Sequence, residues 1–281
     1  MPFGRRVALC LSAVLLACVT AGCGRKPAER VEWTTMGTVA SFLCRDSAEL
    51  GKARDVMDVF ANVETLLNAH NPDSELSRLA ALSDDEVLAR CDEMVRPCYE
   101  AAFRLMRESE GAFNPRWRGQ ATLDLGGIAK GFALDLAAER IGSAEAMIDL
   151  GGNLKSCGGE WNVAVYGASG DSGERLVLAA GNACATSAEY ARGKHIYDAR
   201  TGLPVTNGVF SVTVVHPTSA MLADGLSTIL FIFGPEKGDA FLKAHYPEAY
   251  AVWQVSADYG IIYNQRLNIH KGDYTNGNKS S

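Results

Sequence analysis

Three short segments of the chain combine residue types that handle phosphate, metal ions and protons. The first, Asp124–Gly131, has the sequence DLGGIAKG, so a carboxylate precedes a glycine pair and a lysine. Glycines let the backbone approach a ligand closely, and the start of a following helix offers unpaired N–H groups to an anion. Lys130 would add a positive charge in the first helical turn. The segment matches neither GxxxxGK[ST] nor GxGxxG, so it indicates either a phosphate-binding turn or a plain tight turn.

The second segment places an acidic residue and a hydroxyl four positions apart. Asp224 and Thr228 fall on a predicted helix, where that spacing puts both side chains on one face. A carboxylate and a hydroxyl are hard oxygen ligands of the kind that Mg²⁺ takes together with substrate phosphate. The alternative is an exposed aspartate beside a threonine that bonds back to a helix carbonyl.

The third segment, Lys194–Pro204, has the sequence KHIYDARTGLP. Its Asp, Thr-Gly and Pro residues predict a rigid loop. His195, beside that loop, could act as a general base near neutral pH. The chain has five histidines, so a histidine without a functional role is the other interpretation.

The composition limits which classes of protein the chain can belong to. The chain has 281 residues, of which 47% are apolar and 21% charged, and its formal net charge is −6. These values suit a globular protein and exclude a disordered, collagenous or coiled-coil chain. The acidic balance argues against nucleic-acid binding, which would show a basic stripe. A phosphate-bearing ligand would therefore need local positive charge from a metal ion or from a few lysines and arginines.

The N-terminal residues have the pattern of an export signal. Arg5 and Arg6 precede an apolar stretch, Val7–Thr20, that is too short to span a bilayer as a stable helix. Residues 1–22 are therefore predicted to be a signal peptide and are excluded from fold reasoning. The tetrapeptide that ends at Cys23 resembles a bacterial lipobox, in which Cys23 would be acylated and become the mature N-terminus. Ordinary cleavage, with Cys23 an incidental thiol, is the alternative.

The rest of the chain divides into a tether, one domain and a tail. Residues 23–30 are polar and predict a lipid-anchored tether, residues 31–270 predict the folded domain, and residues 271–281 predict a polar tail. We expect the protein to lie outside the cytoplasm, anchored by lipid on the periplasmic side of a bacterial membrane.

The cysteines of the mature chain do not indicate a zinc site, because no CxxC pair occurs among them. Cys91 and Cys98 could form a structural disulfide in an oxidising compartment.

The hydrophobic pattern predicts strands and helices without regular βα alternation, which favours an α+β fold of mainly antiparallel sheets with packed helices. The sequence predicts strands over 31–43, 146–150, 162–166, 175–180, 209–216, 249–256 and 260–263. It predicts helices over 47–68, 94–110, 127–141 and 219–233, the last ended by Gly234-Pro235, and a short helix capped by Ser74. The pentapeptide Leu123–Gly127 (LDLGG) echoes Ile148–Gly152 (IDLGG), but two such pieces are too short to establish a repeat.

The three segments occur in order among seven that together resemble one family. The pieces are residues 36–38 (MGT), 72–79 (PDSELSRL), 111–115 (GAFNP), 123–131, 149–153 (DLGGN), 195–204 and 217–228. In this set and order the chain resembles the ApbE family, the FAD:protein FMN transferases. The resemblance runs from Met36 to about Gly234, and a lipoprotein leader is usual in that family.

The resemblance implies a site and a reaction. FAD would lie in a cleft of a T-fold-like domain, and Mg²⁺ would be held by Asp224, Thr228 and the main-chain oxygen of Gly127. His195 matches the family's proposed base. The flavin nucleotide positions would be Met36, Ala112, Phe113, Asn114, Asp124, Lys130 and Ile196, with His70 against the isoalloxazine. The reaction would move FMN from FAD onto a threonine hydroxyl of an acceptor protein and release AMP. Acceptors in that family are flavin-bearing subunits of sodium-pumping NADH:quinone reductase (Nqr), Rnf-type complexes and related extracytoplasmic electron-transfer proteins.

The chain departs from the family pattern at four positions. His70 stands where the family often has another aromatic residue, Asn114 where many members have Asp, Ala199 where many have Pro, and Ser227 where some are acidic.

Two other functions would use much of the same site. One is a Mg²⁺-dependent FAD pyrophosphatase that yields FMN and AMP, and the other is a non-catalytic FAD-binding lipoprotein.

Overall fold

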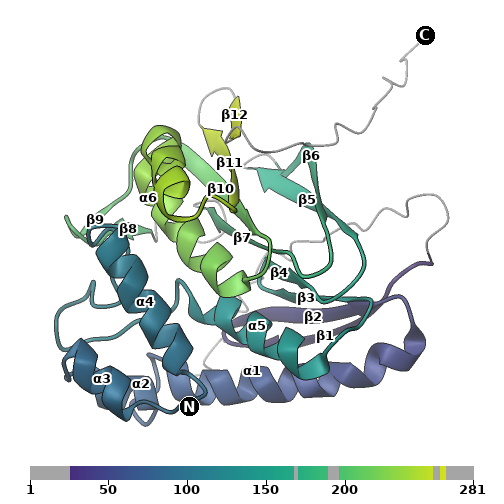
Figure 1. The fold of residues 1–281 in the computed structure, drawn as a ribbon, viewed down its shortest axis with the longest axis horizontal. Helices are drawn as coiled ribbons and strands as arrows, with labels where there is room; N and C mark the ends of the chain where they lie inside the picture. The colour runs from purple at the N-terminus through teal and green to yellow at the C-terminus, as the bar shows by residue number, and fades with distance from the viewer. Residues whose placement is uncertain (1–25, 168–169, 189–195, 256–259, 264–281) are drawn as a thin grey trace, which may run out of the picture.

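The fold is built on one antiparallel sheet. The computed structural model describes residues 26–167, 170–188, 196–255 and 260–263. Within these ranges eight strands pair in the order β1-β2-β3-β4-β7-β10-β11-β12, and helices pack on one face of the sheet (Figure 1). The strands of this sheet are β1 (Glu29–Thr35), β2 (Thr38–Cys44), β3 (Ala146–Leu150), β4 (Asn153–Ser156), β7 (Ala183–Ala188), β10 (Val209–His216), β11 (Tyr250–Val255) and β12 (Gly260–Tyr263).

Two strand pairs lie outside the main sheet. They are β5 (Trp161–Gly167) with β6 (Gly170–Leu178), and the short pair β8 (Tyr197–Asp198) with β9 (Leu203–Pro204). The helices are η1 (Ser47–Lys52), α1 (Ala53–Leu67), α2 (Glu75–Leu79), α3 (Asp84–Arg90), α4 (Arg96–Glu108), α5 (Ala129–Ile141) and α6 (Ala220–His245).

The sheet separates two hydrophobic cores, because successive residues of a strand point to opposite faces. Phe42 and Ile148 belong to the core that includes the helices, together with Phe60 of α1. Their neighbours Leu43 and Met147 belong to a second core, formed with the β5–β6 hairpin. The hairpin thus covers the face that the helices leave open.

Helices α5 and α6 cross at very close range. A Cβ atom on Gly131 of α5 would overlap the carbonyl oxygen of Ala220 and would lie 2.8 Å from Cβ of Asp224. Asp135 of α5 also holds the first turn of α6, because its carboxylate accepts hydrogen bonds from the backbone N–H groups of Ala220 at 2.8 Å and Met221 at 3.0 Å. The start of α6 is therefore fixed against α5.

Helix α6 is interrupted where the sequence predicts its end. Gly234 has φ 72° and ψ −179°, and the helix resumes at Pro235 and continues to His245. The side-chain amide of Asn207 donates to the carbonyl of Phe231 at 2.8 Å and to that of Ile232 at 3.2 Å, so it satisfies carbonyls that the break leaves without helical partners. The predicted helix is thus correct as far as residue 233, and a second helical piece follows it.

The predicted α+β class is confirmed, with one wrong strand. Residues 31–43 do not form a single strand, because the chain turns back at Met36 (φ 47°) and Gly37 (φ 69°) to make the β1–β2 hairpin. Two central residues with positive φ are what a two-residue hairpin turn requires. The sequence analysis also did not predict α3, β4, β7 and the β8–β9 pair.

Cys91 and Cys98 are both buried free thiols, so the structure does not form a disulfide between them.

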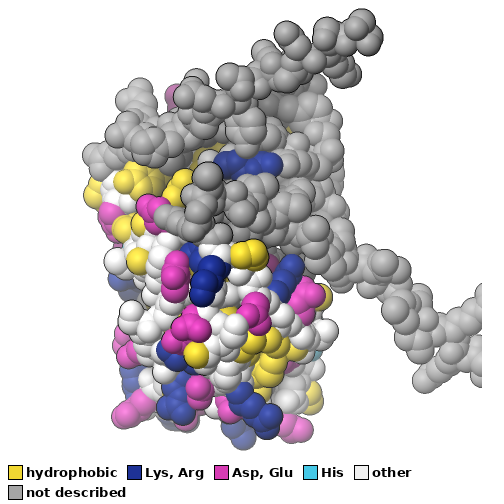
Figure 2. All heavy atoms as spheres, turned by 90° about the vertical axis from the view of Figure 1, so that its right-hand side faces the viewer, with side chains coloured by type: hydrophobic (Ala, Val, Ile, Leu, Met, Phe, Trp, Pro, Cys, Tyr) yellow, Lys and Arg dark blue, Asp and Glu magenta, His cyan; other side chains and the backbone are white. Residues whose placement is uncertain are grey.

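The predicted targeting segments fall outside the described ranges. These include the signal peptide, Cys23 and the tail 271–281, so the domain boundaries stay predictions. No helix in the described part of the chain has the length and apolar character needed to cross a membrane. Basic and acidic side chains are interspersed over the lower half of the face drawn in Figure 2.

Candidate active site

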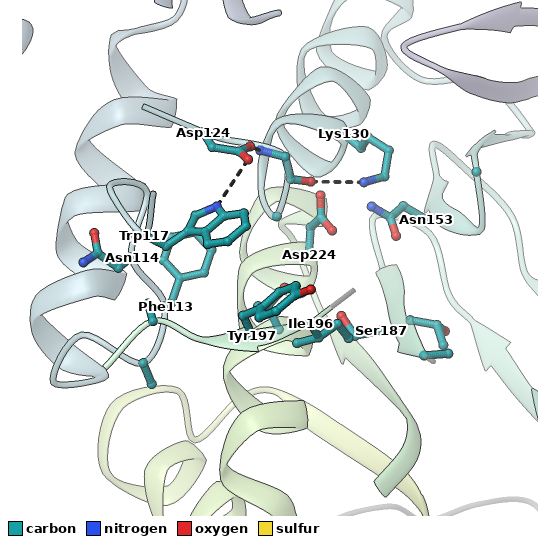
Figure 3. Close-up of a pocket in the computed structure, with 18 of the residues that line it drawn as sticks. Phe113, Asn114, Trp117, Asp124, Lys130, Asn153, Ser187, Ile196, Tyr197 and Asp224 are labelled. Carbon is teal, nitrogen blue, oxygen red and sulfur yellow. Dashed lines mark hydrogen bonds between the residues drawn. The ribbon is translucent and has the colours of Figure 1, made fainter. Parts of the chain in front are cut away.

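A pocket of about 470 Å³ opens where the N-terminal turn of α5 meets α6, the β3–β4 turn and the end of β7 (Figure 3). The residues that line it are His70, Ala112, Phe113, Asn114, Trp117, Arg118, Asp124, Gly126, Gly127, Lys130, Gly151, Gly152, Asn153, Thr186, Ser187, Ala188, Ile196, Tyr197, Ala199, Asp224 and Thr228. A volume of this size is typical of sites for small molecules and cofactors.

The turn before α5 forms one wall of the pocket. The carboxylate of Asp124 accepts a hydrogen bond from the backbone N–H of Gly126 at 2.9 Å and one from the indole N–H of Trp117 at 3.3 Å. Lys130 donates from Nζ to the carbonyl of Gly126 at 3.3 Å, one turn back. The turn is thereby held in a shape that keeps the Lys130 ammonium group at the pocket wall.

The three residues predicted to hold a metal ion line the same pocket. Asp224 is only 5% exposed, and its Oδ2 accepts a hydrogen bond from the N–H of Gly131 at 3.0 Å. The position of a Cβ on Gly127 lies 3.3 Å from Oγ1 of Thr228, so the Gly127 backbone adjoins that hydroxyl. The alternative of an exposed aspartate is therefore wrong. The hydroxyl that bonds back to a helix carbonyl is that of Ser227, which donates to the carbonyl of Asp224 at 2.8 Å.

The donor set fits a hard divalent cation. A carboxylate, a hydroxyl and a backbone carbonyl offer oxygen alone, which suits Mg²⁺. Within the described ranges no group of three or more His, Cys, Asp or Glu side chains could hold a metal ion. Among the described lining residues, Arg118 and Lys130 are balanced by Asp124 and Asp224. An anionic substrate would thus meet no net positive charge from these side chains, and a bound cation would supply it.

Two aromatic side chains that line the pocket, Trp117 and Tyr197, stack on each other. The rings of Trp117 and Tyr197 are stacked, with centroids 5.4 Å apart and planes 14° from parallel. The guanidinium of Arg118 lies 4.6 Å from the centroid of the Trp117 ring. Such surfaces bind flat conjugated rings by stacking. This pair was not predicted, because Trp117 and Tyr197 lie far apart in the sequence and share no periodic pattern.

The β3–β4 turn closes the sheet side of the pocket. Gly151 (φ 65°) and Gly152 (φ 90°) form it, and Oδ1 of Asp149 accepts the N–H of Gly152 at 2.9 Å. Burial raises the pKa of Asp149 from its ordinary value of 3.8 to about 6, although the bond from Gly152 opposes this. The two echoing pentapeptides, far apart in sequence, therefore both end at this one pocket.

Most of the residues predicted for the flavin nucleotide lie together here. His70, Ala112, Phe113, Asn114, Asp124, Lys130 and Ile196 all line the pocket. Met36 is not a lining residue; it lies in the β1–β2 turn, where its N–H donates to Oε2 of Glu64 at 2.9 Å. His195 and Cys23 lie outside the described residues. Sequence reasoning missed Trp117, Arg118, Asn153 and the β7 residues Thr186–Ala188.

A model of the ApbE family matches residues 36–120 and 116–253. The chain belongs to the ApbE family. The resemblance in the sequence is thus confirmed, and the two matches meet at the segment that carries Trp117.

Relatives of this ApbE-family chain match it over most of its length. The FAD:protein FMN transferase of Vibrio cholerae serotype O1 is 27% identical over 305 residues, covering 84% of this chain and 90% of that protein. The FAD:protein FMN transferase of Treponema pallidum is 27% identical over 346 residues, covering 90% of this chain and 94% of that protein. Among solved structures, the apo form of the flavinyl transferase ApbE of Pseudomonas stutzeri matches with a TM-score of 0.70 and 22% identity, covering 86% and 96% of the two chains. This last likeness shows the shared fold.

Proposed function

We propose that this protein transfers FMN from FAD to a threonine hydroxyl of an acceptor protein and releases AMP. The observation that carries the proposal is the meeting of Asp224, Thr228 and Gly127 in one pocket with Lys130, in a chain of the ApbE family. Relatives over most of the chain have the name FAD:protein FMN transferase. FAD is the substrate.

The reaction joins the threonine oxygen to the phosphorus of the FMN half and breaks the bond between that phosphorus and the bridging oxygen. The hydroxyl proton is lost, and AMP leaves with the bridging oxygen. A diphosphate resists this attack because its anionic oxygens repel a nucleophile. Lys130 and the N–H groups at the start of α5 offset that charge where it develops.

Asp224, Thr228 and the carbonyl of Gly127 are the groups that would hold Mg²⁺. When bound, the ion neutralises phosphoryl oxygens and acts as a Lewis acid toward the departing phosphate. The balanced charges of the pocket side chains support a metal requirement, since Lys130 and Arg118 are already offset by Asp124 and Asp224.

Two further groups complete the proposal. The Trp117–Tyr197 stack, together with His70 and Phe113, which line the same pocket, would bind a ring of the dinucleotide. His195, which immediately precedes Ile196 in the sequence, would remove the threonine proton, a role that contributes about 10²–10⁴-fold to a rate.

We further propose that the acceptors are flavin-bearing subunits of Nqr-type, Rnf-type or related redox complexes, and that the protein reaches them from the outer side of a membrane through lipid on Cys23. Replacement Cys23→Ala is expected to release the protein from the membrane fraction and to remove the lipid mass from its N-terminal peptide. A variant that stays in the membrane would contradict the anchor.

The reaction is tested by incubating the purified protein with FAD, Mg²⁺ and such an acceptor subunit. Flavin that stays on the acceptor through denaturation, with the mass of FMN on a threonine, supports transfer. Free FMN without labelled acceptor would indicate hydrolysis, and FAD held unchanged would indicate a binding protein. Both outcomes contradict the proposal.

Asp224→Ala is expected to lower the transfer rate by roughly 10²–10³-fold or more, the scale of losing one charge-stabilising group. Asp73→Ala, at an exposed turn, is the matched control and should leave the rate unchanged. A fully active Asp224→Ala enzyme would remove the basis of the proposal.

A further inference from the structure

Asn153 is a buried amide on the pocket wall with an unused donor. The residue begins β4, is 3% exposed and lines the pocket. Within the described part of the chain, its Nδ2 has no hydrogen-bond partner. Buried side-chain donors are nearly always paired, and each exception calls for an explanation.

Asn207 shows that the fold can pair a side-chain amide fully. Asn207 donates from Nδ2 to two carbonyls of α6 and accepts from the N–H of Val209 at 3.1 Å. Gln254, 3% exposed, is also unpaired at its side-chain amide among the described residues, but it does not line the pocket. Of these three side-chain amides, only Asn153 both lines the pocket and has an unpaired donor.

The surroundings of Asn153 indicate what its donor meets. Figure 3 shows its amide directed toward the space beside Lys130 and Asp224. Lys130 comes from the helix side of the pocket and Asn153 from the sheet side. A donor facing a space that also holds an ammonium group is suited to an anionic oxygen.

The backbone fixes Asn153 in this place. Asn153 pairs with Leu150 across the β3–β4 turn, and the carboxylate of Asp149 holds the N–H of Gly152 inside that turn. A Cβ on Gly151 would lie 2.6 Å from Oγ1 of Thr38, so the turn packs directly against β2. The amide is thus presented by a rigid element, as preorganised recognition requires.

We propose that Asn153 is a substrate-binding residue whose Nδ2–H donates a hydrogen bond to a phosphoryl oxygen of the FAD diphosphate. This inference rests on the proposed function for the identity of the ligand. Asn153 and Lys130 would hold the diphosphate from two sides, one as a neutral donor and the other as a charge.

The test measures binding of three probes in the presence of Mg²⁺: FAD, ADP and riboflavin. ADP carries the diphosphate without the flavin, and riboflavin carries the flavin without phosphate. Asn153→Ala is expected to weaken FAD and ADP binding about tenfold or more, the scale of a hydrogen bond to a charged group, and to leave riboflavin binding unchanged. Asn153→Asp, which replaces the donor by an anion, should weaken the first two probes further.

Gln254→Ala is the matched control, because it removes a buried unpaired amide away from the pocket. It should leave the affinity for all three probes unchanged, and thermal unfolding of each variant identifies losses that come from the fold. Equal weakening of riboflavin, or unchanged FAD and ADP binding in Asn153→Ala, would overturn the proposal. Because binding needs no turnover, a wild-type protein that binds FAD but transfers nothing would overturn the proposed function and leave this test intact.

Discussion

The two Asp-Leu-Gly-Gly segments of the chain end at the same pocket but are built differently. The side chain of Asp124 is 24% exposed and accepts a hydrogen bond from the N–H of Gly126. The segment that begins with Asp124 leads into helix α5. Asp149 is 8% exposed and accepts a hydrogen bond from the N–H of Gly152. The segment that begins with Asp149 leads into strand β4. One segment places a lysine at the pocket and the other an asparagine.

The difference shows that the same four residues can serve two purposes. The first segment faces the ligand, and its carboxylate also holds the indole of Trp117 at 3.3 Å. The second segment is a support, whose buried carboxylate shapes a turn from inside the sheet. Substitutions in the first should therefore act on binding and those in the second on stability.

The largest expected effect comes from the helix that continues the first segment. Gly131→Ala places a methyl group against the backbone of Ala220, so the free energy of unfolding should fall by about 3 kcal/mol, the upper end of overpacking costs. Urea denaturation measures it. Gly51→Ala, where nothing lies within 4 Å of the added Cβ, should change stability by less than about 1 kcal/mol. Equal stability of the two variants would refute the close crossing of α5 and α6.

The next largest effect is expected from the supporting carboxylate of Asp149 as the pH changes. Burial raises the pKa of Asp149 to about 6, so the folded state keeps this proton to a higher pH than the unfolded chain. The stability from this group is complete below about pH 4 and is lost as the pH rises through 6. The free energy of unfolding of wild type minus that of Asp149→Asn should fall by roughly 2–3 kcal/mol between pH 4 and pH 7. A flat difference curve would show that Asp149 is not held in a low-dielectric site.

Loss of the ligand-facing carboxylate of Asp124 is expected to have a smaller effect, on FAD binding. Asp124→Ala releases the N–H of Gly126 and the indole of Trp117, so FAD affinity should fall roughly tenfold while the unfolding temperature changes little. Titration of FAD fluorescence measures the affinity, with Asp73→Ala as an exposed control. A large loss of stability with normal FAD affinity would reverse the roles assigned to the two segments.

The smallest effect is expected at the aromatic partner of the first segment. Trp117→Phe keeps a ring to stack on Tyr197 and loses one long hydrogen bond to Asp124, so FAD affinity should fall by about threefold or less. Trp117→Ala should have the larger effect in the same titration. If both variants bind FAD as wild type does, the stacked pair is not part of the site.

Local patterns in the sequence predicted the parts of the fold that depend on local physics. Strands β3 and β10 are buried apolar runs bounded by turns, and both were predicted to the residue. Helix periodicity located Asp224 and Thr228 on one face, and the structure brings both to the pocket.

The errors occur where tertiary contacts decide. Strands β4 (NLKS) and β7 (ACATSA) carry small or polar residues, and pairing on both sides makes them strands. Gly234-Pro235 ended the predicted helix, although proline is well suited to start the next helical turn. Trp117 and Tyr197 come together only through the packing of separate elements, so no local spacing could pair them. Asn153 ends the DLGGN segment, but that segment alone does not show that its amide lines the pocket.

Arg116 has a consequence for engineering this protein. Its guanidinium is buried and donates to the carboxylate of Asp84 and to the carbonyls of Ala80, Leu82 and Gln120. The exposed residues Trp117 and Arg118 follow this anchor directly and line the pocket. Randomising those two positions would therefore sample new substrate preferences while the scaffold stays folded, which makes them a natural starting point for directed evolution.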